Sequence, residues 1–254
     1  MIGRFKENTI YLEDCYKAIK DIPNNSIDLI LTDPPYDIKH TTGGGMLKEK
    51  RLINMFSDLR ENELNIGIND EILNEWCRVM KKINIYIWCN KTLIPKLINY
   101  FVNEKGCMFD IIIWNKTNAI PLCGSKYLTD CEYCLYFHET MKLNTTYETA
   151  KTVYYQPINV DDKKLFNHPT CKPTNILRNL IFNSSNEGDV VLDTFMGSGS
   201  TAVACKELGR KYLGFEIDNE FYQIAINRLN GITKDERKLF KDNNSLFGDD
   251  DEES

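Results

Sequence analysis

The chain has 254 residues, of which 42% are hydrophobic and 27% are charged. These values are ordinary for soluble proteins and allow one sizeable core. The formal net charge of −6 argues at first against a nucleic-acid partner, because basic surface usually supplies the affinity for phosphate backbones. Five of the acidic residues, however, form one run at Asp249–Glu253, and without it the chain has 32 acidic and 31 basic residues. Composition therefore does not exclude nucleic acid.

Other classes are excluded more firmly. No stretch approaches the roughly 20 apolar residues of a membrane span, and the first residues lack the apolar core of a signal peptide. The nine cysteines fit free thiols in a reducing compartment, so we expect a cytoplasmic location. The one close pair, Cys131 and Cys134, lies in a predicted strand. Residues three apart on a strand point to opposite faces and chelate poorly, so we expect no metal.

Short apolar runs alternate with helical patterns, which predicts an α/β fold with a doubly wound, mostly parallel sheet. Several of the runs are apolar throughout, as expected for strands buried on both faces. In chain order the expected strands are Thr9–Leu12, Ile27–Leu31, Ile83–Trp88, Phe109–Trp114, Tyr133–Phe137, Val190–Leu192 and Tyr212–Phe215. The expected helices are Cys15–Lys20, Ile72–Lys81, Thr92–Asn103, Asn175–Phe182, Thr201–Leu208 and Glu220–Leu229.

The elements predict a single domain over residues 1–235, followed by an acidic tail, 236–254, that we expect to be disordered. Two polar, turn-rich segments, Asp37–Asn69 and Thr140–Asn167, fit neither the strand nor the helix pattern. Long irregular segments in a compact domain are usually functional loops, so we interpret both as loop insertions with a role in binding.

The first candidate site follows the strand Val190–Leu192. Asp193 comes next and leads into a loop with Gly197 and Gly199, and then into a helix. The two glycines permit a tight turn and the close approach of a ligand to the backbone. The following strand ends in Glu216, where a carboxylate can accept hydrogen bonds from ribose hydroxyls. This arrangement predicts a nucleoside-cofactor site.

Two alternatives remain for this segment. The spacing Gly197-x-Gly199-x-x-Ala202, with Glu216 further on, also satisfies the dinucleotide fingerprint of nicotinamide and flavin enzymes. The segment can also be simple packing of a strand on a helix. Asp193 argues against a dinucleotide, because its charge would repel a pyrophosphate, whereas a cofactor with an ammonium and a sulfonium group would be attracted.

The second candidate site follows Ile27–Leu31, where the chain reads Asp33-Pro34-Pro35-Tyr36. The prolines stiffen the turn, so that the Asp33 carboxylate and the Pro34 carbonyl form two rigid acceptors beside an aromatic ring. Such a group suits the exocyclic amino group of a planar base. A rigid strand exit with a packed tyrosine is the alternative.

A third motif, His-Pro-Thr-Cys-Lys-Pro at 168–173, precedes a predicted helix. With Asp33–Tyr36 and Asp193–Thr201 in this order, the chain resembles the β class of S-adenosylmethionine-dependent amino-group DNA methyltransferases, from about Thr9 to Leu229. Most members carry glutamine where Cys171 stands. This departure falls between the Pro-Thr and Lys-Pro pairs and leaves the assignment intact.

The resemblance implies a fold and an order of strands. The β class places the catalytic motif before the cofactor loop, which implies a seven-stranded, Rossmann-like methyltransferase sheet that is circularly permuted. Val190–Leu192 would be its first strand, Tyr212–Phe215 its second, Thr9–Leu12 its third and Ile27–Leu31 its fourth. The single domain would then be the catalytic domain, and both insertions would be candidates for target recognition.

The resemblance also implies site residues. The catalytic residues would be Asp33, Pro34, Pro35 and Tyr36. The cofactor S-adenosylmethionine would be bound by Asp14, Thr170, Lys172, Asp193, Phe195, Gly197, Ser198, Gly199, Thr201 and Glu216. Basic residues in the two insertions are candidates for contacts to DNA phosphates, with solvated loops as the alternative: Lys48, Lys50, Arg51, Lys163 and Lys164.

The activity that we expect is methylation of the adenine N6 amino group in double-stranded DNA, because the cytosine-N4 enzymes of the family usually begin the motif with serine rather than Asp33. Alternatives are a cytosine-N4 enzyme, an RNA or protein-amide methyltransferase, and a non-catalytic DNA-binding subunit. A second copy of the chain and a cognate restriction endonuclease are further candidate partners.

Overall fold

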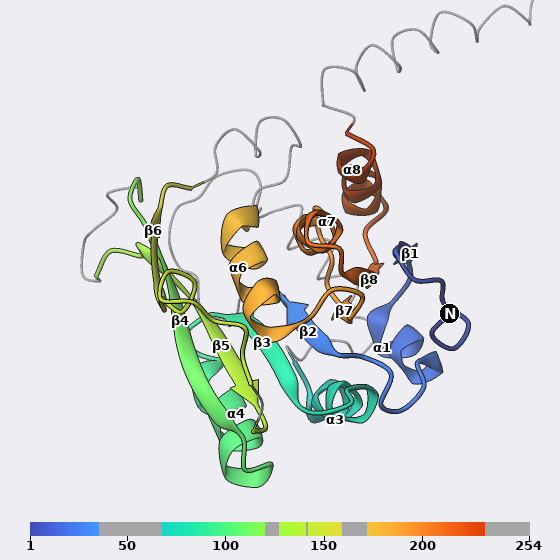
Figure 1. The fold of residues 1–254 in the computed structure, drawn as a ribbon, viewed down its shortest axis with the longest axis horizontal. Helices are drawn as coiled ribbons and strands as arrows, with labels where there is room; N and C mark the ends of the chain where they lie inside the picture. Colours follow the sequence, from blue (N-terminus) through green and yellow to red (C-terminus); the bar gives the residue numbers. More distant parts are fainter. Residues whose placement is uncertain (36–67, 120–126, 141, 159–171, 232–254) are drawn as a thin grey trace, which may run out of the picture.

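The computed structural model describes residues 1–35, 68–119, 127–140, 142–158 and 172–231. Its centre is one eight-stranded sheet in the order β1-β8-β7-β2-β3-β5-β4-β6 (Figure 1). Neighbouring strands run parallel except at β5, which is antiparallel to both β3 and β4. The strands are β1 (Thr9–Leu12), β2 (Leu29–Thr32), β3 (Asn84–Cys89), β4 (Met108–Lys116), β5 (Cys131–His138), β6 (Val153–Gln156), β7 (Val190–Asp193) and β8 (Lys211–Glu216).

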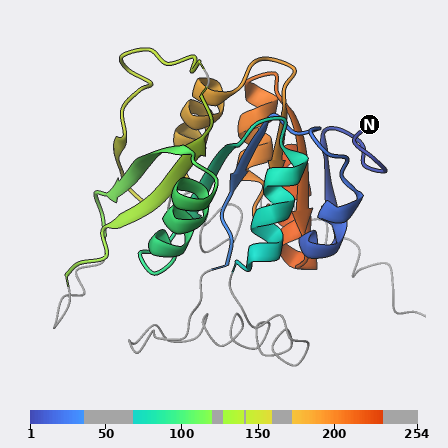
Figure 2. The same cartoon turned by 90° about the horizontal axis from the view of Figure 1, so that it is seen from below.

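Helices cover both faces of the sheet, which confirms the doubly wound α/β prediction (Figures 1 and 2). One face carries α1 (Cys15–Ala18), α3 (Asp70–Val79) and α4 (Ile94–Ile98), and the other carries α6 (Thr174–Ser184), α7 (Ser200–Glu207) and α8 (Asn219–Leu229). A 3-10 turn, Ile19–Asp21, extends α1, and a π-helical segment, Asn99–Glu104, extends α4. No helix in the described part of the chain is long and apolar enough to cross a membrane.

Local sequence accounts for these elements. In α3, the side chain of Asn69 caps the first turn by accepting a hydrogen bond from the Ile72 backbone nitrogen over 3.0 Å. Ile72, Trp76 and Val79 recur at helical spacing and are buried, so that one stripe of the helix packs on the sheet. In β2 and β7 every residue is buried, as expected for central strands of a parallel sheet.

The sheet has one strand more than the seven that we expected. The additional strand, β6, lies inside Thr140–Asn167, so the prediction of a loop insertion is wrong for Val153–Gln156. This strand pairs in parallel with β4 from Ile113 onward, and the Trp114 indole donates a hydrogen bond to the Gln156 carbonyl over 2.9 Å. Only four residues long and alternating between half-buried and exposed, β6 carries a weak apolar signal among polar neighbours.

The register of the central strands determines where the site lies. In the parallel pair β2 and β7, Leu29 lies beside Val191 and Ile30 beside Leu192. Both strands therefore end at the same edge of the sheet, and the residues that follow them are neighbours. In an open α/β sheet, ligands bind at this carboxyl edge.

Candidate active site

The conformation of the loop after β7 requires glycine at position 199. Gly199 is the N-cap of α7 and has a φ of 78°, a left-handed conformation that side chains disfavour. A Cβ at this position would also lie 3.0 Å from the Cβ of Ala225 in α8. The loop is anchored to β8 by the Met196 backbone nitrogen, which donates to the Phe215 carbonyl over 2.9 Å. The turn is thus held closely against its neighbours on both sides.

Glu216 closes the same loop from the end of β8. One carboxylate oxygen accepts a hydrogen bond from the Gly197 backbone nitrogen over 2.7 Å, and the other accepts one from the Asp218 nitrogen over 2.9 Å. Burial raises the pKa of Glu216 above its ordinary value, while these two N–H groups limit the rise. The structure therefore brings Glu216 to the glycine loop, where the sequence placed it. Its role toward a ribose stays a prediction.

Asp14 and Phe195 approach this edge from opposite sides of β8. The Asp14 carboxylate caps α1 and accepts a hydrogen bond from the Tyr16 nitrogen over 3.0 Å. The Tyr16 ring meets the Phe195 ring edge-on, with the centroids 6.4 Å apart. Tyr16 was not among our predicted site residues, although an aromatic residue two positions after a predicted cofactor ligand was the available signal. Together the three side chains offer a carboxylate beside two aromatic rings.

Asp193 is buried, with 3% of its surface exposed, and it organises the loop from within. Its carboxylate accepts hydrogen bonds from the hydroxyls of Thr32, over 3.0 Å, and Thr201, over 2.7 Å, and from the Phe195 nitrogen, over 3.1 Å. Burial raises the pKa of Asp193 to about 7, against the effect of these donors, and the nearby Asp33 carboxylate adds to the rise. The Asp193 carboxyl group is thus enclosed within the loop rather than exposed at its surface.

Ser198 and Thr201 serve the framework of the loop. Ser198 is buried, and the Arg228 guanidinium from α8 donates to the neighbouring Ser200 hydroxyl over 2.7 Å. The same guanidinium reaches the Thr174 hydroxyl at the start of α6 over 3.0 Å. Arg228 was missed by the sequence analysis. It joins the loop to the helix that follows the His-Pro-Thr-Cys-Lys-Pro motif.

The second candidate site begins where β2 ends. Asp33 is half-buried, Pro34 is buried and Pro35 is half-buried. The ammonium group of Lys172 contacts the Asp33 carboxylate in a charged hydrogen bond. We expected Lys172 to bind the cofactor. The structure places its ammonium group on the catalytic motif, and its role toward the cofactor stays a prediction.

Two further charged residues extend this pair, and neither was predicted. The Lys172 ammonium nitrogen lies 3.1 Å from a carboxylate oxygen of Glu132 in β5, and the other oxygen of Glu132 lies 2.7 Å from the ammonium nitrogen of Lys116 in β4. Burial alone would lower the pKa of Lys172, but Asp33 and Glu132 outweigh it and hold that pKa above its ordinary value. A charged residue at the start of a buried strand was the one available signal for Glu132.

Several predicted residues lie outside the described part of the chain, and their roles stay predictions: Tyr36, Lys48, Lys50, Arg51, Lys163, Lys164 and Thr170. The acidic tail 236–254 and the insertion Asp37–Asn69, except for its last two residues, lie outside it too. Among the residues that are described, no group of three or more histidine, cysteine or acidic side chains is placed to hold a metal ion.

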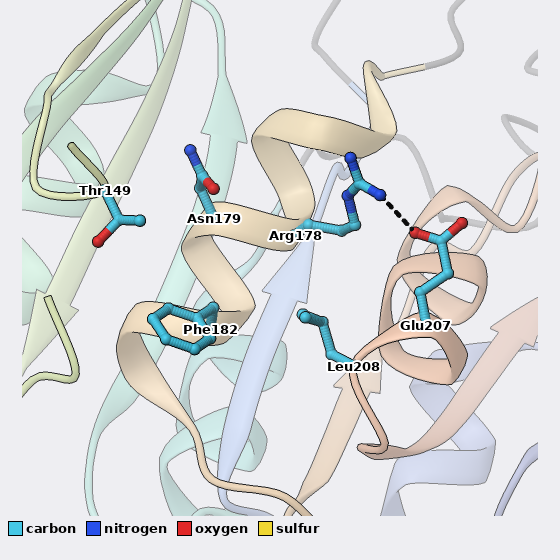
Figure 3. Close-up of a pocket in the computed structure, with 6 residues that line it drawn as sticks. All are labelled: Thr149, Arg178, Asn179, Phe182, Glu207 and Leu208. Carbon is cyan, nitrogen blue, oxygen red and sulfur yellow. Dashed lines mark hydrogen bonds and ion pairs between the residues drawn. The ribbon is translucent and has the colours of Figure 1, made fainter. Parts of the chain in front are cut away.

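A surface pocket of about 360 Å³ lies between α6 and α7 and is separate from this site. Arg178 of α6 and Glu207 of α7 form an ion pair of 3.1 Å across it (Figure 3). The other lining residues are Thr149, Asn179, Phe182 and Leu208. None of the predicted site residues lines this pocket.

The fold and the site define a Rossmann-like α/β protein in which a glycine-containing ligand loop adjoins an acidic, proline-stiffened strand exit. Residues 27–227 match the model of the N6_N4_Mtase family, described as DNA methylase. The chain therefore belongs to the DNA methylase family and is a methyltransferase, which confirms the resemblance at the level of the family.

Individual relatives agree with this assignment. The Type II methyltransferase M.HinfI of Haemophilus influenzae is 29% identical over 251 residues, which cover 89% of this chain and 69% of that protein. The Type II methyltransferase M2.LlaDCHI of Lactococcus lactis subsp. cremoris is 29% identical over 245 residues, which cover 89% and 90%. Among solved structures, the M1.HpyAVI-SAM complex is similar with a TM-score of 0.65 and 25% identity, over 87% of this chain and 98% of that one.

Proposed function

We propose that the protein transfers a methyl group from S-adenosylmethionine to the N6 amino group of adenine in double-stranded DNA. The observation that carries this proposal is the junction of the two motifs. Thr32, the residue before Asp33, donates its hydroxyl hydrogen bond to Asp193 of the glycine loop. A carboxylate suited to an amino group is thus tied directly to a loop suited to a nucleoside cofactor.

The residues of the loop fit this cofactor. The tight turn at Gly199 leaves the backbone close to a bound ligand. Glu216 supplies negative potential for a cationic ligand, and Asp193 adds to it once it is ionised, above about pH 7. Asp14, with the rings of Tyr16 and Phe195 beside it, suits an adenine ring. The cofactor supplies a methyl group activated by a positively charged sulfur. The M1.HpyAVI structure was solved with SAM bound, which supports this choice.

The chain's own contribution to the chemistry is positioning. With the target base rotated out of the duplex, the Asp33 carboxylate and the Pro34 carbonyl accept hydrogen bonds from the amino group and direct its lone pair. With the cofactor bound, its methyl carbon would exchange its bond to sulfur for a bond to the amino nitrogen, the electron pair would stay on sulfur, and the proton lost from nitrogen would pass to solvent. No covalent enzyme intermediate is needed, so orientation and electrostatics carry the catalysis.

Adenine rather than cytosine is the base that we propose, because the motif begins with Asp33. The family that the chain matches includes both the N6 and the N4 enzymes in its name. The relatives M.HinfI and M2.LlaDCHI are Type II methyltransferases, which supports the adjoining proposal that this protein works beside a restriction endonuclease. A cytoplasmic location is proposed as well, because the cysteines in the described part of the chain are free thiols.

Four further proposals concern organisation. The observed order β1-β8-β7-β2 corresponds to strands three, two, one and four of a doubly wound sheet, which supports a circular permutation. Residues 1–235 are proposed as one catalytic domain. The basic residues of the insertions are proposed to contact DNA phosphates, and a homodimer is the proposed assembly.

The test is direct. Purified protein is incubated with S-adenosylmethionine carrying a labelled methyl group and with unmodified genomic DNA, and the digested nucleosides are identified by mass. Labelled N6-methyladenine is expected, while a protein carrying Asp33→Asn serves as the inactive control. Labelled N4-methylcytosine would favour the alternative enzyme. Absence of label from the DNA, with transfer to RNA or protein, would overturn the proposal.

A further inference from the structure

The ion pairs around Asp33 form a chain of alternating charge that reaches into the antiparallel half of the sheet. Lys116, Glu132, Lys172 and Asp33 follow one another in space, with Lys172 between two carboxylates and Glu132 between two ammonium groups. Nothing in the methyl-transfer motifs includes Lys116 or Glu132. They come from β4 and β5, whereas Asp33 follows β2.

The Lys172 ammonium group is enclosed. Its side chain is 8% exposed, and its nitrogen lies 5.2 Å from the centre of the Trp88 ring. A buried cation of this kind is strongly stabilised by each carboxylate that reaches it. The position of the Lys172 ammonium group therefore depends on both carboxylates. Removal of one carboxylate strengthens the attraction between the ammonium group and the carboxylate that remains.

We propose that Glu132 is a positioning residue for methyl transfer, which acts on Asp33 through Lys172. The inference rests on the proposed catalytic role of Asp33. Glu132 shares the Lys172 ammonium group with Asp33 and takes up part of its positive charge. The Asp33 carboxylate thereby keeps its strength as a hydrogen-bond acceptor toward the amino group. Without Glu132, the full charge of Lys172 falls on Asp33 and weakens that acceptor.

The effect that we propose for Glu132 depends on its negative charge. Its carboxylate is held ionised, because Lys172 and Lys116 outweigh the effect of burial and lower its pKa. Glu132→Gln keeps the shape and removes the charge. We expect kcat for methyl transfer to fall roughly 10- to 100-fold, the range for loss of a charged group that orients a functional side chain. The KM and the dissociation constant for S-adenosylmethionine should change less than about twofold, because the glycine loop is untouched.

A second variant separates loss of catalysis from loss of folding. In the double variant K116Q/E132Q, one cation and one anion are removed together, so the net charge of the network is preserved, and replacing both partners disturbs folding less than replacing one. The same loss of kcat is expected. Glu207→Gln is the matched control, because it removes an exposed carboxylate that pairs with Arg178 away from the site, and it should retain the kcat of the unmodified protein.

The measurements are label transfer to unmodified genomic DNA at saturating cofactor, calorimetric binding of S-adenosylmethionine and thermal melting. An unchanged kcat in the double variant would overturn the inference. So would a loss that appears in cofactor binding instead of kcat. Asp33→Asn is assayed in parallel. If it retains turnover, the proposed function itself fails, whereas an inactive Asp33→Asn with a fully active Glu132→Gln rejects the role of Glu132 alone.

Discussion

The Thr32 hydroxyl donates a hydrogen bond to a carboxylate oxygen of Asp193 over 3.0 Å, although 161 positions separate the two residues in the chain. Thr32 ends β2 and Asp193 ends β7, so the bond joins the strand before the catalytic motif to the strand before the cofactor loop. The same hydroxyl lies 3.1 Å from the Thr194 hydroxyl. Buried hydrogen bonds among Thr32, Asp193 and Thr194 thereby connect the catalytic motif to the cofactor loop.

Removal of this hydroxyl should loosen both halves. Thr32→Val keeps the shape of the side chain but leaves Asp193 without one of its donors, which should cost about 1–3 kcal/mol of folding free energy. Affinity for S-adenosylmethionine should fall as well. Denaturant unfolding and calorimetric titration measure the two effects. Thr32→Ser retains the hydroxyl and is the control; if it loses as much as Thr32→Val, the hydrogen bond is not the cause.

The role of Asp33 predicts a separation of binding from chemistry. Asp33→Ala and Asp33→Asn both remove the charged acceptor, and we expect methyl transfer to fall at least about 100-fold, as when a positioned electrostatic group is lost elsewhere. Binding of S-adenosylmethionine should be largely preserved. Single-turnover label transfer and cofactor titration report the two quantities. Retained turnover in either variant would contradict the assignment of Asp33.

Asp193 should make stability depend on pH in an uncommon direction. Its pKa is raised by burial from an ordinary value of 3.8 to about 7, so between these values the folded protein holds a proton that the unfolded chain has released. The contribution of this group is fully present below about pH 4 and is lost as the pH rises toward 7, with a slope of at most about 1.4 kcal/mol per pH unit.

The check on Asp193 is a comparison of unfolding free energies from pH 4 to pH 8 in the unmodified protein and in Asp193→Asn. The difference between the two should grow across this interval, since other groups titrate alike in both. A constant difference would show that Asp193 does not titrate there. Because a cationic ligand favours the ionised carboxylate, affinity for S-adenosylmethionine should rise through pH 7 and do so less in the variant.

Gly199 and Gly106 offer a matched pair for the loop. Both have positive φ angles, 78° and 73°, but a Cβ at Gly199 would meet Ala225 at 3.0 Å, whereas a Cβ at Gly106 would meet nothing within 4 Å. Both substitutions to alanine should cost about 1–2 kcal/mol through backbone strain. Gly199→Ala should cost more and should also weaken cofactor binding. Equal melting temperatures of the two variants would show that the contact with α8 is unimportant.

Much of the fold could be predicted because the strands and the glycine loop follow from local patterns of apolar and turn residues. All seven expected strands are present, with ends that differ by at most two residues, and the glycine loop with Glu216 opposite it follows from the order strand, turn, helix, strand. The start of the second strand shifts by two residues, from Ile27 to Leu29, and has a physical reason. Ile27 forms only an isolated bridge with Met80, and the Val190 backbone nitrogen donates to the Asp28 side chain over 3.0 Å, so that regular pairing starts at Leu29.

The rest depends on contacts that local patterns do not contain. The partners of Lys172 could not be predicted, because Asp33 follows β2 and Glu132 lies in β5, and only the assembled sheet brings them to the Lys172 ammonium group. From the sequence we expected the Asp193 carboxylate to face the cofactor. In the structure it is buried and accepts hydrogen bonds from three donors. Strand β6 was missed because four half-exposed residues give no distinctive period.

The direction of β5 has one more consequence. In the parallel part of the sheet, the ligand edge receives the residues that come after a strand, which are loop residues. Because β5 runs the opposite way, its second residue, Glu132, reaches that edge from within the ladder, where it lies opposite Trp114 of β4. A charged group at the site is therefore carried on rigid backbone, and its place is set by strand register rather than by loop conformation.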